Sequence, residues 1–323
     1  MWRAVLVLLV GVVLLIVPLF CSKYWIGLLT QALIVGVFSM GLDLLVGYTG
    51  MPTLGHAAFF GLSGYTTAIA ITRYQVDPWL AAAIGVVFAT ALAVAFGPLA
   101  VRLRGLPFLT VTLAFGQLCW GLITRWGSFT GGENGIAGVR RPTLVIGPLD
   151  LQQPAGFYWF TLLCLAVLVV FIYRFANSAM GMSLLGVRDS DRRMLALGYN
   201  VHARRSVAFI SASTVASVCG VLSALFNNYV GPSSLDWRYS AQGLLGVVVG
   251  GAGSLWGPLI GGMGLHVLKT YIVGQTDLWA MILGVLYVVT VVALPGGLAS
   301  LPARIRGRRS RAALAEAAPF QVD

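Results

Sequence analysis

Residues 79–101 read WLAAAIGVVFATALAVAFGPLAV, a run of 23 residues that contains no charged side chain. A bilayer core about 30 Å thick is crossed by roughly 20 helical residues, so this run is long enough to span it. Further apolar runs occupy residues 4–20, 26–46, 55–71, 107–123, 157–173, 206–226 and 278–294. The sequence therefore predicts an all-α polytopic integral membrane protein with about eight transmembrane helices.

The composition excludes most other classes of protein. Of the 323 residues, 58% are hydrophobic and 10% are charged, whereas a soluble domain has roughly 45–50% apolar and about 25% charged residues. The 21 basic side chains outnumber the 10 acidic ones, but the basic segments are short and lack interleaved aromatic residues, which argues against nucleic-acid binding. The four cysteines are scattered without ligand spacing, so no metal site is predicted.

The basic residues indicate the topology. If Arg3 lies inside the cell, then Arg102, Arg104, the segment 174–205 and the arginine-rich tail lie inside as well, which agrees with the positive-inside rule. We therefore expect both termini in the cytoplasm, a cytoplasmic loop at 174–205 and a periplasmic loop at 124–156. The transmembrane domain would cover 1–303, and the basic tail 304–323 is expected to be partly disordered.

Residues 243–273 are apolar but interrupted by Gly250, Gly251, Gly253, Gly257 and Pro258. Because the flanking segments lie on the same side, 243–273 crosses the membrane an even number of times. We expect a glycine-rich re-entrant hairpin that enters from outside, or ten spans if a longer hairpin crosses twice. Its glycines recur at small-xxx-small spacing, for which tight helix packing is favoured over a direct part in the translocation pathway.

Few polar side chains lie inside the apolar runs, and each is a candidate for function because a charge in a membrane is costly. Asp43 either belongs to a translocation pathway or pairs near the inner end of its helix. His266 is expected to be a packing histidine, and Lys269 lies close enough to the end of its segment to reach the interface.

The segment Gly47–Gly61, GYTGMPTLGHAAFFG, interrupts the apolar pattern with glycines, a proline and hydroxyls. This composition is typical of unwound backbone beside a substrate path, with Tyr48, Thr49, Thr53 and His56 as candidate pathway residues. An ordinary uncharged turn is the alternative. In the segment 128–136, SFTGGENGI, Glu133 and Asn134 are candidates for contact with a partner outside the cell.

The segment 181–200, GMSLLGVRDSDRRMLALGYN, predicts a short helix at the cytoplasmic surface, capped by Asp189 or Ser190 and ended by Gly198. It is either a loop that sets topology or a surface on which a soluble motor acts. The chain has no Walker A loop, no hydrolase motif and few carboxylates. These absences favour a permease driven from elsewhere over a self-sufficient carrier, a channel or an intramembrane enzyme.

Together with RGLPFLTVTLAFG (104–116) and GLLGVVVGGAGSLWGPLIGG (243–262), these segments stand in the order seen in permease subunits of branched-chain amino acid ABC importers, the LivM type. The chain resembles that family over residues 26–300. The resemblance implies the ABC importer permease fold, the bacterial inner membrane, a periplasmic binding protein, a second homologous permease and two cytoplasmic ATPases. ATP and Mg would be held by the ATPases, with no cofactor in this chain.

The resemblance also implies roles for single residues. The segment 181–200 would be the coupling region that docks on an ATPase, and its candidates are Arg188, Asp189, Asp191, Arg192, Arg193, Leu197 and Gly198. Branched-chain or related amino acids are the expected substrates, with urea, short amides or aromatic acids as alternatives. The chain departs from the family pattern at Met51, Pro52 and Thr53, at Gly186 and at 192–195, which affects the details of the pathway and of the ATPase surface.

Overall fold

The structure is a computed structural model that describes residues 22–143, 145–146 and 149–275, together with positions 18, 281, 284, 285, 288 and 297. Apart from these single positions, the predicted spans 4–20 and 278–294 lie outside the described residues, as does the basic tail 304–323.

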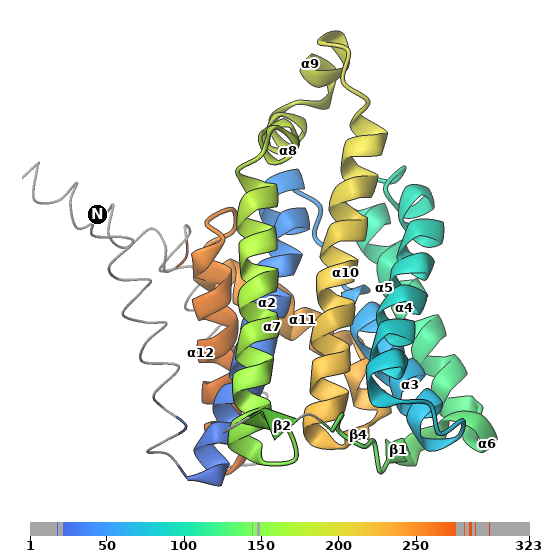
Figure 1. Ribbon diagram of the computed structural model, residues 1–323. Helices are drawn as coiled ribbons and strands as arrows, with labels where there is room; N and C mark the ends of the chain where they lie inside the picture. Colours follow the sequence, from blue (N-terminus) through green and yellow to red (C-terminus); the bar gives the residue numbers. More distant parts are fainter. Residues whose placement is uncertain are drawn as a thin grey trace, which may run out of the picture.

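Long apolar helices dominate the described part of the chain (Figure 1). Five of the described helices are long and apolar enough to cross a membrane: α2 (Lys23–Thr49), α4 (Pro78–Ala100), α5 (Leu106–Arg125), α7 (Pro154–Ala176) and α10 (Val201–Asn227). They confirm the corresponding predicted runs; four of the helices extend their runs by a few residues, and α4 has the predicted length but begins one residue earlier. The extension of α10 is instructive, because Asn200 caps it by accepting the N–H of Ala203 at 3.0 Å, so that the helix begins before Arg205.

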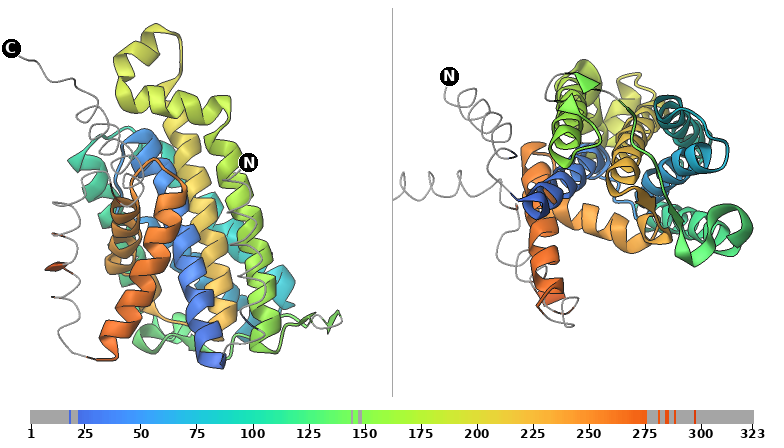
Figure 2. Two further views of the ribbon diagram at one scale, coloured as in Figure 1. Left: turned by 90° about the vertical axis from the view of Figure 1, so that its left-hand side faces the viewer. Right: turned by 60° about the horizontal axis from the view of Figure 1, so that its bottom comes forward.

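Helix α2 lies at the centre of the bundle, where it contacts α7, α10, α11 (Trp237–Gly250) and α12 (Trp256–Val273) (Figure 2). Its apolar side chains point in every direction, which suits a helix that is surrounded by protein. A second group packs α3 (His56–Thr72) and α4 against α10. Helices α4 and α7 expose aliphatic side chains such as Val87 and Val167, which form faces suited to lipid.

The predicted hairpin is present as α11 and α12, which pack against each other and are joined by residues 251–255. Gly250 faces the backbone of Gly257, and Gly261 faces that of Gly246, so the glycine spacing does permit close helix approach. Helix α11 begins at Trp237 rather than at 243, because polar side chains in its first turns have hydrogen-bond partners from other helices. Ser240 accepts the N–H of Ala57, and Gln242 accepts a hydrogen bond from Lys269.

The two ends of the bundle differ (Figure 1). One end, here the α9 end, carries α8 (Ala179–Asp189) and α9 (Asp191–Ala196). The other, the β4 end, carries the short elements α6 (Gly127–Thr130), η1 (Gly132–Asn134), β1 (Ile136–Ala137), β2 (Val145–Ile146), β3 (Leu149–Asp150), β4 (Tyr229–Val230) and η2 (Pro232–Ser234). Strands β1 and β4 pair antiparallel, with Ile136 opposite Val230, and β2 pairs with β3. These two-residue ladders are added to the expected all-α fold.

Candidate functional site

Residues 50–55 connect α2 to α3 without helical structure, as the glycines and Pro52 of this segment predict. Gly50 ends α2 in the left-handed conformation, with φ at 69°, which glycine adopts without a steric penalty. Thr53 is fully buried, and its hydroxyl accepts the N–H of Gly55 at 3.2 Å. Gly55 lies against the backbone carbonyl of Thr112 in α5, where no side chain would fit.

His56, at the start of α3, is buried among aromatic rings rather than exposed. The rings of Phe59 and Phe209 meet it edge-on, and its Nε2 lies 3.3 Å from the hydroxyl of Ser213 in α10. Its Nδ1 has no hydrogen-bond partner within the described residues. The imidazole therefore keeps one unused polar atom beside the non-helical segment.

The remaining candidates on α2 are also buried. Thr49 donates its hydroxyl to the carbonyl of Leu45 at 2.7 Å, and Tyr48 packs in the core. Asp43 is 0% exposed, and its two carboxylate oxygens accept the N–H groups of Gly253 at 2.8 Å and of Leu255 at 3.3 Å. Asp43 thus pairs with the tip of the hairpin, near the α9 end of α2.

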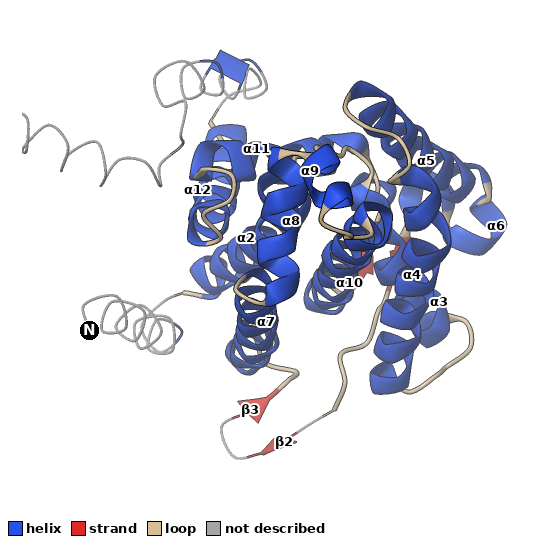
Figure 3. Ribbon diagram, turned by 90° about the horizontal axis from the view of Figure 1, so that it is seen from above, coloured by secondary structure: helices blue, strands red, loops and turns tan. Residues whose placement is uncertain are grey.

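The coupling candidates lie on α8, α9 and the turn that follows, which together cross the α9 end above α2 and α10 (Figure 3). Ser190 caps α9, because its hydroxyl accepts the N–H of Arg193 at 3.4 Å. Gly198, two residues beyond the end of α9, has a φ of 81°, which agrees with the prediction that a glycine there ends the helix. Met194 packs with Val187 and Val201, whereas Leu197 is 71% exposed.

Asp191 turns toward the bundle and pairs with two arginines. Its Oδ2 lies 2.5 Å from Arg104, in the α4–α5 connection, and 2.7 Å from Arg205, in the first turns of α10. The Arg205 side chain is 8% exposed and that of Arg104 is 59% exposed, so the Arg205 pair is the better shielded from water. Asp189, Arg192 and Arg193 are exposed.

The structure brings the end of α2 next to the coupling candidates. A pocket of about 310 Å³, the junction pocket, is lined by 49–51, 104–105, 187–192 and Arg205. Arg188 reaches from α8 across this region and donates a hydrogen bond from Nη1 to the carbonyl of Gly47. Thr49 therefore shares one pocket with Arg188, Asp189, Asp191 and Arg192, whereas His56 and Thr53 do not line it.

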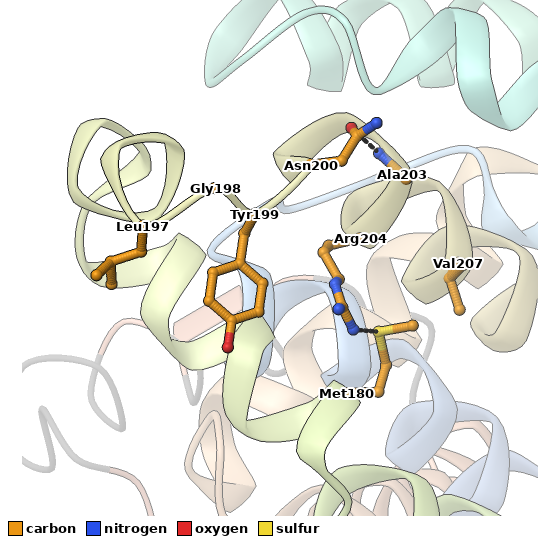
Figure 4. A pocket seen from close by; sticks show the side chains of 8 residues that line it. All are labelled: Met180, Leu197, Gly198, Tyr199, Asn200, Ala203, Arg204 and Val207. Carbon is orange, nitrogen blue, oxygen red and sulfur yellow. Dashed lines mark hydrogen bonds between the residues drawn. The ribbon is translucent and has the colours of Figure 1, made fainter.

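A second pocket, the Tyr199 pocket, has a volume of about 540 Å³ and lies between α8, the turn after α9 and the start of α10 (Figure 4). The Arg204 guanidinium lies 2.9 Å from the sulfur of Met180 and 5.4 Å from the centre of the Tyr199 ring. Leu197 and Gly198 also line it. This pocket gives the coupling segment an open apolar and aromatic surface.

At the β4 end, η1 presents Glu133 and Asn134 to solvent. The hydroxyl of Tyr229 donates to the backbone carbonyl of Asn134 at 3.1 Å, which holds η1 beside β4. The side chains of these two candidates are thus available to a partner.

Two arginines that were not identified from the sequence hold this region in place. Arg73 donates to the carbonyl of Ser128 at 2.7 Å and lies over the ring of Phe129. Arg141 donates to the carbonyls of Leu225 and Phe226 at the end of α10, and lies over the ring of Phe157. Burial lowers the pKa of Arg141.

The other residues missed from the sequence are Arg104, Arg205, Ser213 and Ser240. For the two arginines the only signal was weak, because it consisted of an opposite charge on the same predicted side of the membrane, and for the two serines the sequence offered no signal. No group of three His, Cys, Asp or Glu side chains that could hold a metal ion occurs within the part of the chain that the structure describes.

Comparison with known proteins identifies related sequences. Residues 24–294 match the family described as branched-chain amino acid transport system / permease component. The chain is 26% identical to the high-affinity branched-chain amino acid transport system permease protein LivM of Escherichia coli K12, over 87% of this chain and 71% of that protein. It is 26% identical to LivM of Salmonella typhimurium LT2, over the same shares of the two chains.

A second group of relatives bears the name of a different permease protein. The chain is 23% identical to the permease protein LivH of Escherichia coli K12, over 82% of this chain and 91% of that protein. No solved structure is significantly similar to the chain.

Proposed function

The chain belongs to the family of permease components of branched-chain amino acid transport systems, and from this premise we propose that it forms one half of the translocation pathway of an ATP-driven importer. As a permease component, the chain is a non-catalytic transport subunit. A second homologous permease would supply the other half, and the existence of two kinds of relative, LivM and LivH, supports a pair of different subunits.

The pathway is proposed to run beside the non-helical segment 50–55. This segment interrupts two helices inside the apolar bundle, and such unwound backbone is tolerated at membrane depth where it is buried in protein or lines a cavity. Thr53 and His56 would face the substrate route deep in the bundle, and Tyr48 and Thr49 would lie at its end near α9.

The α9 end is proposed to lie in the cytoplasm and to dock on an ATPase through the segment 181–200. The observation that carries this proposal is the junction pocket, where the end of α2 and the coupling candidates line one space. Arg192, Arg193 and Leu197 are exposed on the segment 181–200. ATP and Mg would be bound by the two ATPases and not by this chain.

The β4 end would then lie in the periplasm, with Glu133 and Asn134 toward a substrate-binding protein. Lipid would cover the aliphatic faces of α4 and α7 in the bacterial inner membrane, and both chain termini would be cytoplasmic. Branched-chain amino acids are the proposed substrates, because the named relatives belong to transport systems for them.

The test begins with gentle purification of the tagged chain from native membranes. We expect two ATPases and a second permease to copurify, and the reconstituted assembly with its binding protein to take up labelled leucine. Uptake of urea or an aromatic acid in place of leucine would contradict the proposal that branched-chain amino acids are the substrates. A stable chain that purifies alone would contradict the importer.

The variant Arg192→Glu with Arg193→Glu tests the docking surface. Both side chains are exposed, so the double reversal should leave membrane insertion intact, but it repels an acidic partner surface and should abolish uptake. Arg102→Glu, an exposed arginine of the α4–α5 connection, is the matched control. Full uptake by the double variant would contradict ATPase docking at these two positions.

A further inference from the structure

The tip of the α11–α12 hairpin is fastened to the centre of the bundle by one buried carboxylate. Asp43 is fully buried in α2, and each of its carboxylate oxygens accepts a backbone N–H from the tip, one from Gly253 and one from Leu255. Leu255 is the residue that precedes α12, so the carboxylate also lies at the positive end of that helix, where a negative charge is favourable.

The coupling helix α8 also contacts this end of α2. The guanidinium of Arg188, from α8, donates to the carbonyl of Gly47, one turn beyond Asp43 in α2. A β-carbon on Gly253 would lie 3.4 Å from Nη1 of Arg188, and one on Gly50 would lie 3.4 Å from its Cγ. The arginine therefore lies between the end of α2 and the hairpin tip.

The geometry around these groups is tight. A side chain at Gly47 would overlap both the Asp43 carboxylate and the backbone of Gly253. Leu255 has a φ of 57° and a ψ of −59°, and the N–H of Trp256 donates to the carbonyl of Ser254 at 2.7 Å, so Leu255 is the central residue of a tight γ-turn with positive φ, a rare and strained conformation for a residue with a side chain. The hydrogen bond from its N–H to Asp43 helps to hold this conformation, which is maintained only where the surroundings fix it.

We infer that Asp43 and Arg188 are positioning residues that join the hairpin tip and the coupling helix α8 to the same end of α2. These three elements would then move together when an ATPase displaces α8. This latch, formed by Asp43, Gly47, Arg188, Gly253 and Leu255, rests on the proposed function and deepens it by naming the residues that carry movement from the docking surface to the hairpin.

The latch assigns Asp43 a role different from substrate binding. A pathway residue needs a polar atom that is left for the substrate, but both carboxylate oxygens of Asp43 already accept hydrogen bonds from the hairpin tip, whereas His56 keeps Nδ1 without a partner among the described residues. Arg188 likewise donates a hydrogen bond to the backbone of α2, although it lies on the exposed coupling helix. Its side chain therefore contacts the bundle and is also exposed on the surface that an ATPase would contact.

The first experiment measures the latch in the full-length chain as purified from membranes together with any subunits that accompany it, by hydrogen–deuterium exchange of the backbone amides in detergent. Asp43→Ala removes both acceptors, so the amides of Gly253 and Leu255 should exchange faster. Asp43→Asn keeps one acceptor oxygen and should give an intermediate rate. Exchange in α4, which does not contain latch residues, serves as the control for general loosening. Unchanged exchange at the tip in Asp43→Ala would overturn the inference.

The second experiment separates positioning from ATPase docking, in vesicles that contain the complete importer. Arg188→Ala should lower uptake by about tenfold, the factor that corresponds to roughly 1.4 kcal/mol, which is near the lower end for a hydrogen bond to a charged group. ATP hydrolysis stimulated by the binding protein should persist, because the ATPases remain docked. Arg188→Lys, which keeps a charged donor, should recover part of the uptake, and Arg102→Ala is the control for loss of an exposed charge.

Two results of the second experiment would overturn the latch. One is uptake by Arg188→Ala equal to that of Arg102→Ala. The other is loss of the ATPases from purified Arg188→Ala, which would assign the arginine to the docking surface alone. Failure of the wild-type chain to bind any ATPase would contradict the proposed function instead, and the exchange experiment would still decide whether the hairpin tip depends on Asp43.

Discussion

At the scale of single residues, the polar side chains beside 50–55 form hydrogen bonds with both short-range and long-range partners. Thr53 bonds within its own turn, whereas His56 depends on Ser213 from a helix far along the chain. Because a buried polar group without a partner is costly, each of these contacts fixes the path of the non-helical backbone.

The effect of Thr53 can be measured with an isosteric change. Thr53→Val keeps the shape of the side chain but leaves the N–H of Gly55 without its acceptor, so the free energy of unfolding should fall by about 1 kcal/mol, and uptake should fall with it. Thr110→Val is the matched control, because Thr110 is exposed and bonds only to carbonyls of its own helix. Thermal unfolding in detergent compares the two, and equal melting temperatures would contradict a special role for Thr53.

At the scale of elements, the sequence predicted helices well and their long-range partners poorly. The apolar runs located α2, α4, α5, α7 and α10, because a helix in a bilayer is encoded by its own composition. The start of α11 was misplaced, since Ser240 and Gln242 are polar when considered alone and are satisfied only by Ala57 and Lys269.

The candidate site likewise contains local features that the sequence predicts and long-range contacts that it does not. The break at 50–55 and the cap at Ser190 could be predicted, because glycine, proline and capping residues act locally. The orientation of Asp191 could not, since its partners Arg104 and Arg205 come from separate elements and nothing in the local pattern distinguishes an inward aspartate from an exposed one.

The hairpin offers a matched pair of glycines within α12. A β-carbon at Gly261 would meet the backbone of Gly246 and Gly250, whereas one at Gly264 would meet nothing within 4 Å. Gly261→Ala should therefore destabilise the chain by roughly 1–3 kcal/mol through overpacking, while Gly264→Ala should be neutral or stabilise it by up to about 1 kcal/mol. Urea or thermal unfolding in detergent distinguishes them, and a stable Gly261→Ala chain would show that the helices can separate without cost.

At the scale of the whole molecule, the two ends are built for different contacts. The α9 end has charged helices and open pockets, and the β4 end has a loop held down by Arg73 and Arg141. A rigid platform at the β4 end suits a binding protein that must deliver its substrate in one orientation.

This platform can be tested with two adjacent arginines. Arg141→Ala removes three hydrogen bonds to backbone carbonyls and should lower the free energy of unfolding by roughly 1.5–3 kcal/mol. The concentration of binding protein that gives half-maximal ATP hydrolysis should rise. The neighbouring Arg140 is exposed, so Arg140→Ala should change neither quantity. If both variants need the same amount of binding protein as the wild type, Glu133 and Asn134 do not depend on the anchored loop.

The pairing of Asp43 with the hairpin also affects how the protein is made. Asp43 enters the membrane early in translation, but Gly253 follows it by 210 residues. A carboxylate in a bilayer without hydrogen-bond donors is unfavourable. Insertion of α2 into lipid before the hairpin exists therefore carries this cost. The Asp43 carboxylate can therefore gain its two donors only after the hairpin has been synthesised and has reached α2.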